Sequence, residues 1–202
     1  MSRPRLLGAV LAGGEGRRFG GPKGDAPVGG MPMAARAVAA LRPWVEEVVV
    51  VSSRPLAAAS ARVIPDRVSG AGPLGGLDAA LIEAEALGLD GVFLLACDLP
   101  LVSSSLVGKV VACLGAAGAA APARAPSGVE PLCAVYGLGV RPSVEALLNG
   151  PDRSLHALFR EVGGRVVSAE FLGDGAQAAF LNVNTQSDRD RAEAAISQQE
   201  ER

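Results

Sequence analysis

A short apolar run that ends in a glycine-rich loop is the feature that most constrains how this chain can fold. Leu6–Leu11 has the length and composition of a buried parallel strand. The loop after it, residues 12–30, contains consecutive glycines such as Gly13 and Gly14, whose backbone N–H groups can surround an anion without interference from side chains. The sequence therefore predicts an anion-binding loop at the end of a first strand.

Positive charge in the same loop indicates that the anion is a phosphate. Arg17, Arg18 and Lys23 lie within it, and a triphosphate needs such charge around it. The loop is not a P-loop, because Pro22 precedes Lys23 and Gly24 follows it, and its glycine spacing differs from the G-x-G-x-x-G pattern of dinucleotide-binding folds. The alternative is a surface loop with solvated basic residues.

The rest of the chain alternates apolar runs with amphipathic segments. This order predicts crossover connections and an α/β fold with a mostly parallel sheet and helices on both faces. Further strands are expected at residues 48–51, 62–64, 91–97, 119–123, 132–136 and 166–171. Helices are expected at residues 32–41, after a Gly/Pro loop at 69–76 up to Ala86, and at residues 103–114, 144–148, 154–162 and 187–199, the last with Ser187 as its N-cap. No linker or repeat interrupts the order, so we expect one domain over residues 1–202.

Asp98 is the candidate metal ligand. It follows the apolar strand expected at residues 91–97, where a carboxylate is costly unless it lies at the end of the sheet near a cation. Magnesium prefers one or two carboxylates together with phosphate oxygens and water. Ligands of such sheets lie outside the carboxyl ends of the strands, so Gly13, Ser53 and Asp98 should converge on one site. The alternative role for Asp98 is a turn or capping aspartate.

Other polar residues are weaker candidates. Asp66 lies in a loop and is either a site residue or a turn carboxylate. Asn182 and Asn184 precede the last helix and are either acceptor-binding residues or caps. His156 and the three cysteines lack partners at catalytic spacing, so we expect them to be structural.

Composition excludes several classes of function. The net charge is −2 and aromatic residues make up 3% of the chain, which argues against a nucleic-acid partner. The sequence contains no stretch long enough to span a membrane, and we expect that its first residues do not form a secretory signal. Its cysteine spacing suggests neither disulfides nor zinc. We therefore expect a cytoplasmic protein without a membrane partner.

The glycine-rich loop also carries a family resemblance. Leu11-Ala-Gly-Gly, followed by an arginine, a glycine and a lysine, resembles the nucleotide-binding loop of the molybdenum cofactor guanylyltransferases, which belong to a nucleotidyltransferase superfamily with a Rossmann-like fold. Further segments have counterparts in the same order over nearly the whole chain: Gly72-Pro-Leu-Gly-Gly-Leu77, Ala96-Cys-Asp98-Leu-Pro100, Pro131-Leu-Cys-Ala-Val-Tyr136 and Asn182-Val-Asn184-Thr185.

The resemblance implies roles for individual residues. The nucleotide would be contacted by Leu11, Ala12, Gly13, Gly14, Lys23, Ser53, Asp66 and Asp98. Ser53 enters this set because Ser52-Ser53 stands where the family often has an asparagine that holds the base, and serine can also hydrogen-bond a base. Asp66 would belong to the guanosine site, and Asp98 would ligate Mg²⁺. Arg18, Lys23 and Asp98 would be catalytic, and Asn182 and Asn184 would lie on the acceptor side.

The implied reaction transfers GMP from Mg-GTP to the terminal phosphate of molybdopterin. The N-terminal half would bind the nucleotide and the C-terminal half the acceptor. Partners would be these substrates and, transiently, cofactor-delivery proteins or recipient molybdoenzymes. Close alternatives are a molybdopterin cytidylyltransferase, whose family usually has Ala where Gly13 stands, and a guanylyltransferase for cobinamide phosphate. More distant alternatives are an NADP-binding oxidoreductase, with Arg54 holding a 2′-phosphate, and a non-catalytic nucleotide-binding regulator.

Overall fold

The structure is a computed structural model that describes residues 3–13, 22–56, 61–68, 70–125 and 128–200 of the 202-residue chain. At its centre lies an eight-stranded sheet in the order β10-β7-β9-β6-β1-β4-β5, with β8 paired to β7. The strands are β1 (Leu6–Leu11), β4 (Glu47–Val51), β5 (Arg62–Ile64), β6 (Gly91–Ala96), β7 (Ala119–Arg124), β8 (Gly128–Val129), β9 (Cys133–Gly137) and β10 (Arg165–Val167). A separate antiparallel hairpin joins β2 (Pro27–Val28) to β3 (Met31–Pro32).

The sheet is mostly parallel, as predicted. Strand β1 lies between β4 and β6 and is parallel to both, β5 is parallel to β4, and β10 is parallel to β7. Strand β9 is antiparallel to both β6 and β7. Each residue of β6 is buried, which explains why its sequence is a continuous apolar run.

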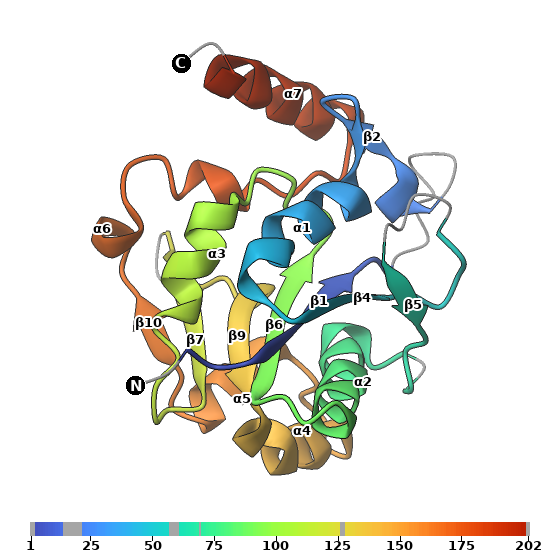
Figure 1. The fold of residues 1–202 in the computed structure, drawn as a ribbon, viewed down its shortest axis with the longest axis vertical. Coiled ribbons are helices and arrows are strands. Elements are labelled where there is room, and N and C mark those ends of the chain that lie inside the picture. Colours follow the sequence, from blue (N-terminus) through green and yellow to red (C-terminus); the bar gives the residue numbers. More distant parts are fainter. Residues whose placement is uncertain (1–2, 14–21, 57–60, 69, 126–127, 201–202) are drawn as a thin grey trace.

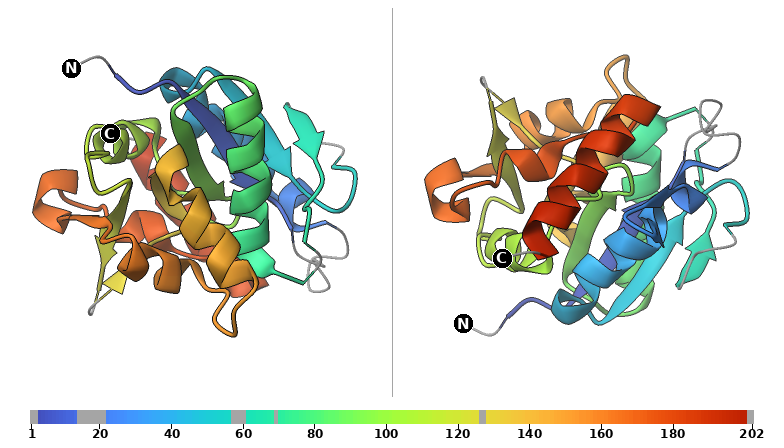
Figure 2. Two further views of the ribbon diagram at one scale, coloured as in Figure 1. Left: turned by 90° about the horizontal axis from the view of Figure 1, so that it is seen from below. Right: turned by 90° about the horizontal axis from the view of Figure 1, so that it is seen from above.

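Helices cover both faces of the sheet (Figures 1 and 2). One face packs against α1 (Met33–Leu41), α3 (Ser104–Val111) and α7 (Gln186–Glu200). The other packs against α2 (Gly72–Ala86), α4 (Arg141–Leu148) and α5 (Leu155–Glu161). The short α6 (Ala169–Leu172) follows β10, and single 3-10 turns occur at η1 (Lys23–Asp25), η2 (Arg42–Trp44), η3 (Leu138–Val140) and η4 (Ala178–Phe180). The two apolar clusters are built mainly from Val, Leu and Ala.

Two predicted boundaries are wrong. The strand expected at residues 166–171 ends at Val167, because Ser168 caps α6 by accepting a hydrogen bond from the Phe171 N–H. The loop expected at residues 69–76 is helical from Gly72 onward. Packing requires a glycine at position 76, since a Cβ on Gly76 would lie 2.6 Å from Leu11 Cδ2.

The predicted cap of the last helix is also wrong. Helix α7 begins at Gln186, so Ser187 lies inside its first turn. The cap is Thr185, whose Oγ1 accepts a hydrogen bond from the Asp188 N–H at 3.2 Å. Threonine followed three residues later by an acidic residue is a capping-box pattern.

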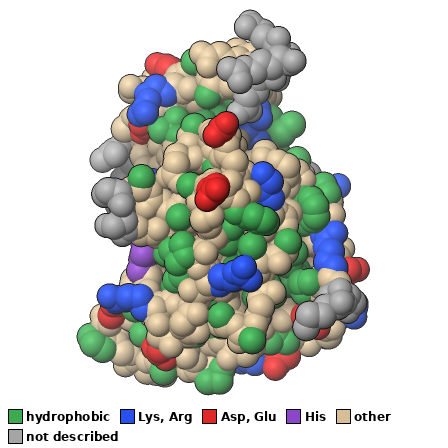
Figure 3. Space-filling view, turned by 90° about the vertical axis from the view of Figure 1, so that its left-hand side faces the viewer, with side chains coloured by type: hydrophobic (Ala, Val, Ile, Leu, Met, Phe, Trp, Pro, Cys, Tyr) green, Lys and Arg blue, Asp and Glu red, His purple; other side chains and the backbone are tan. Residues whose placement is uncertain are grey.

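The side of the molecule that carries β10 and α6 exposes apolar surface. Val166 and Phe171 are each 53% exposed there. Figure 3 faces this side and shows hydrophobic side chains interspersed with charges of both signs. Within the described residues, no helix is both long and apolar enough to cross a membrane.

Candidate nucleotide-binding site

A cleft of about 580 Å³ lies at the carboxyl ends of β1, β4 and β6. The strand ends are tied together by backbone hydrogen bonds: the Ala12 N–H donates to Val51 O and the Cys97 N–H donates to Leu11 O, both at 3.0 Å. The cleft is lined by Leu11, Ala12, Gly13, Pro22, Lys23, Val51, Ser52, Ser53, Arg54, Asp66, Gly70, Gly72, Pro73, Gly76, Ala96, Cys97, Asp98 and Leu132. The predicted convergence of the three strand ends is thus observed.

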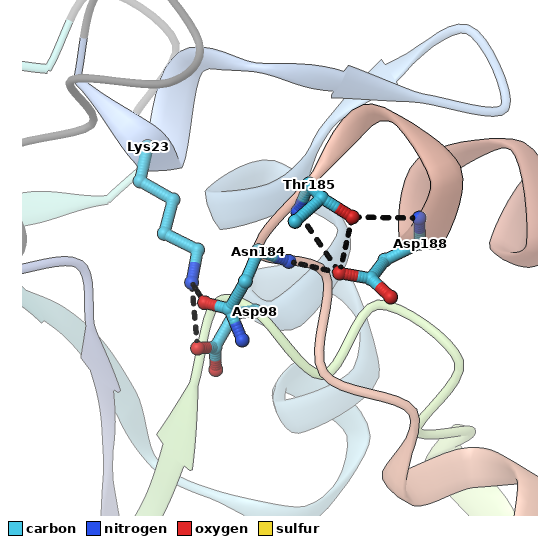
Figure 4. A network of polar contacts seen from close by, with 5 residues as sticks. All are labelled: Lys23, Asp98, Asn184, Thr185 and Asp188. Atoms are coloured by element: carbon cyan, nitrogen blue, oxygen red, sulfur yellow. Dashed lines mark hydrogen bonds and ion pairs between the residues drawn. The ribbon is translucent and has the colours of Figure 1, made fainter.

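Lys23 enters the cleft from the η1 turn. The turn packs closely against the end of β1 and against α1. A Cβ on its buried Gly24 would lie only 3.2 Å from the Cβ atoms of both Ala12 and Ala34, so glycine permits this approach. The Lys23 ammonium donates hydrogen bonds to Asp98 Oδ2 at 2.8 Å and to Asn184 Oδ1 at 2.5 Å. These three side chains come from the first loop, the end of β6 and the segment before α7, and they meet at one point (Figure 4).

Asp98 has one carboxylate oxygen that remains available. Oδ2 pairs with Lys23, whereas Oδ1 is buried and has no hydrogen-bond partner among the described residues. An unpaired buried carboxylate oxygen is costly, and a bound cation would satisfy it. The described residues contain no group of three or more His, Cys, Asp or Glu side chains that could hold a metal ion by themselves. A magnesium ion that arrives with a nucleotide needs only one or two carboxylates, so Asp98 fits that demand.

The first turn of α2 faces the cleft from the other side. Gly72 and Pro73 line the cleft, and Asp66 is held beside them by accepting a hydrogen bond from the Val68 N–H at 3.2 Å. A Cβ on Gly75 would lie 2.8 Å from Asp66 Oδ1, so glycine allows the loop to approach the helix. The free N–H groups of a helix N-terminus favour anions. This contribution was missed from sequence, although the Gly-Pro pair marks a helix start.

Cys97 lines the cleft but is not a nucleophile. Burial, followed by the charge of Asp98, raises the pKa of its thiol to about 12. The thiol therefore stays protonated near neutral pH. All three cysteines are buried and unpaired.

A buried carboxylate near the cleft, that of Glu130, was not predicted. Glu130 is 2% exposed, pairs with Arg124 and accepts a hydrogen bond from the Leu132 N–H at 3.2 Å. Burial raises the pKa of Glu130, and Arg124 opposes that shift. Arg124 also donates to Phe180 O at 3.2 Å, so this pair joins β7 to the segment that leads to α7.

The structure assembles most of the predicted site residues. Those that line the cleft are Leu11, Ala12, Gly13, Lys23, Ser53, Asp66 and Asp98. Asn184 contacts Lys23, which places it beside the nucleotide loop, whereas the half-buried Asn182 has no side-chain hydrogen bond to another described residue. Gly14, Arg17 and Arg18 lie outside the described residues.

Comparisons with known proteins identify the family of this chain. The family described as "MobA-like NTP transferase domain" matches residues 8–180. A probable molybdenum cofactor guanylyltransferase from Opitutus terrae is 37% identical over 194 residues, which covers 92% of this chain and 94% of the relative. The molybdenum cofactor guanylyltransferase of Rhodobacter capsulatus is 34% identical over 200 residues, with 96% and 98% covered.

A solved structure shows the same fold. Molybdopterin-guanine dinucleotide biosynthesis protein A from Archaeoglobus fulgidus superposes with a TM-score of 0.78 at 24% identity, covering 96% of this chain and 100% of that one. The chain therefore belongs to the MobA-like NTP transferase family of nucleotidyltransferases, together with the molybdenum cofactor guanylyltransferases.

Proposed function

We propose that this protein transfers GMP from Mg-GTP to the terminal phosphate of molybdopterin and releases pyrophosphate. The observation that carries the proposal is the meeting of Lys23 and Asp98 in a cleft at the carboxyl edge of the sheet. The two relatives described above support the choice of guanine and of the molybdenum cofactor. The protein is a nucleotidyltransferase, so the proposal concerns its substrates, its metal and the residues that act.

The reaction is an in-line displacement at the α-phosphorus of GTP. A terminal phosphate oxygen of molybdopterin forms a bond to that phosphorus, and the bond to the oxygen bridging the α- and β-phosphates breaks. The electron pair leaves with pyrophosphate. The attacking oxygen is already anionic, so the step needs positioning and charge neutralisation more than a strong general base.

Lys23 and Asp98 divide this work. The Lys23 ammonium has three N–H donors, of which two contact Asp98 and Asn184. Its remaining N–H would bind the phosphates of the nucleotide, and its charge would neutralise the leaving pyrophosphate. Asp98 would hold Mg²⁺ through Oδ1, the oxygen that has no partner among the described residues. When bound, the metal supplies positive charge to phosphate oxygens. Arg18, which lies outside the described residues, is proposed as a further cation of the same loop.

The two halves of the chain are proposed to divide the substrates. Leu11, Ala12, Gly13, Ser53 and Asp66 surround the nucleotide side of the cleft. Gly14 is the remaining proposed nucleotide contact. The acceptor would enter from the C-terminal half, where Asn182 and Asn184 lie. Asn184 would lie between the two substrates, since its side chain contacts Lys23 of the nucleotide-binding loop.

The test is pyrophosphate release from GTP, CTP and ATP in the presence of molybdopterin and Mg²⁺. Turnover should require molybdopterin and should be fastest with GTP. The chain has only two lysines, so Lys23→Ala and Lys109→Ala form a matched pair. Loss of a charged donor on the phosphates should lower kcat by about 100-fold or more in the first variant, and the second should behave like wild type. A preference for CTP, or equal activity of the two variants, would contradict the proposal.

A further inference from the structure

We infer that Asp188, on the first turn of α7, is a positioning residue that holds Asn184 against Lys23. The catalytic consequence of this inference rests on the proposed function, whereas its structural consequence does not. Asp188 does not line the cleft, and its carboxylate points toward Asn184 and Thr185 in the segment before the helix (Figure 4).

Asp188 acts through a set of hydrogen bonds that converge on one oxygen. Its Oδ2 accepts from the Asn184 N–H at 3.1 Å, the Thr185 N–H at 2.9 Å and the Thr185 hydroxyl at 2.8 Å. In return, the Asp188 N–H donates to Thr185 Oγ1 at 3.2 Å. This is a capping box that extends one residue further back than usual, to the backbone of Asn184.

The side chain of the same asparagine contacts the proposed catalytic lysine. Asn184 Oδ1 accepts from Lys23 Nζ at 2.5 Å, while its backbone N–H is fixed by Asp188. One residue earlier, the Val183 N–H donates to the backbone oxygen of Asp98 at 2.9 Å. The segment is therefore anchored on both sides of Asn184, by Asp98 and by Asp188.

Helix α7 is itself fixed relative to Lys23. Its Ala192 and Ile196 are buried in the core cluster that contains α1 and Val28 of β2. A Cβ on Gly29 would lie 3.0 Å from Ile196 Cδ1, so the β2–β3 hairpin and α7 are in close contact. This hairpin directly follows the η1 turn that carries Lys23. The Asp188 carboxylate thus lies on a helix that packs against the β2–β3 hairpin, and this hairpin follows the turn that carries Lys23.

The Asp188 carboxyl group is ionised when it accepts these hydrogen bonds from Asn184 and Thr185. The Thr185 hydroxyl and then the Asn184 N–H lower the pKa of the Asp188 carboxyl below its usual range. Removing the carboxylate leaves two N–H groups without their acceptor and frees the backbone at Asn184. The Lys23 ammonium then keeps Asp98 as a partner but loses the fixed amide oxygen.

Amine labelling tests this arrangement without any substrate. The only two lysines of the chain are Lys23 and Lys109, so the labelling rate of Lys23 can be read by peptide mass spectrometry against Lys109, whose Nζ donates to Leu172 O at 2.6 Å. In Asp188→Ala, the labelling rate of Lys23 should rise roughly fivefold, the effect of one lost hydrogen bond, and that of Lys109 should not change. Asp188→Asn keeps an acceptor oxygen and should fall between the two.

The matched control is Asp190→Ala. Asp190 lies on the same helix and, in the described part of the chain, accepts a side-chain hydrogen bond only from Gln186 Nε2, at 2.8 Å. Its substitution removes the same charge without touching Asn184, so both lysines should label as in wild type. Equal labelling of Lys23 in Asp188→Ala and Asp190→Ala would overturn the inference.

A double-mutant cycle tests the catalytic consequence. Displacing a positioned group by about 1 Å can cost up to about 100-fold in rate, and we expect Asp188→Ala to lower kcat by about 10-fold. In the background of Asn184→Ala, the same change should have no further effect on kcat, because Asp188 acts through Asn184. An additive loss, or an unchanged kcat, would overturn the inference. Failure of the wild type to release pyrophosphate would instead refute the proposed function and leave the labelling result standing.

Discussion

Replacing Gly13 by alanine should change the preference between GTP and CTP without lowering the free energy of unfolding. Gly13 follows β1 and lines the cleft. Its φ angle is not in the left-handed region, and a Cβ built there has no atom of another described residue within 4 Å. The added methyl group would therefore enter the cleft and not strain the fold. Because a purine is larger than a pyrimidine, kcat/KM should fall more for GTP than for CTP.

The geometry gives the expected changes in kcat/KM and in the free energy of unfolding. Overpacking a tight contact by one methyl group costs about 1–3 kcal/mol, which corresponds to a roughly 5- to 140-fold lower kcat/KM for GTP. The free energy of unfolding should stay the same or rise by about 0.4–1 kcal/mol, since alanine restricts the unfolded chain more than glycine does.

The assay compares kcat/KM for GTP and CTP together with Tm. The matched control is Gly139→Ala. This exposed glycine of η3 lies outside the cleft, and a Cβ on it also has no atom within 4 Å among the residues that the structure describes. The control should gain the same stability and keep the nucleotide preference of wild type. Unchanged GTP kinetics in Gly13→Ala, or a fall in Tm that accompanies the loss of activity, would refute the reasoning.

Three further substitutions probe other parts of the account. Asp98→Asn should lower kcat by about 100-fold, because it removes a charged ligand, while the loss of one charge-assisted hydrogen bond to Lys23 should cost only about 1–2 kcal/mol of stability; near-normal turnover in a pyrophosphate assay would exclude a role for the charge. Gly108→Ala would place a Cβ 2.2 Å from Trp44 Cζ2, so the free energy of unfolding should fall by about 1–3 kcal/mol and Tm by several degrees in calorimetry. The pKa of Glu130 is raised by burial, so its contribution to stability is fully present below the pKa of an unfolded glutamate, about 4.3, and is lost as pH rises through the higher folded value. Wild type should therefore lose stability relative to Glu130→Gln as pH rises above about 4.3, and a difference in Tm that does not change with pH would contradict this.

The sequence predicted the strands that carry the site because each is a continuous apolar run followed by a loop. This pattern placed β1, β4 and β6 correctly and brought Gly13, Ser53 and Asp98 to one edge. The antiparallel direction of β9 could not be predicted, because a buried apolar run is the same in either direction.

The start of α2 and the cap of α7 were missed for local reasons. Glycines normally favour a loop, but Gly75 and Gly76 lie in a helix because Asp66 and Leu11 approach it too closely for side chains. At α7, both Thr185 and Ser187 are suitable caps by residue type, and only the hydrogen bonds decide between them. The contact of Lys23 with Asn184 joins residues 161 positions apart, which no local pattern reveals.

The most direct measurement follows the phosphorus atoms of GTP. Incubation with molybdopterin and Mg²⁺ should transfer label from α-phosphate-labelled GTP to a dinucleotide product, and label from γ-phosphate-labelled GTP should appear only in pyrophosphate. Transfer of the γ-phosphate to molybdopterin, or release of the α-label only as GMP, would contradict guanylyl transfer as the activity of this protein.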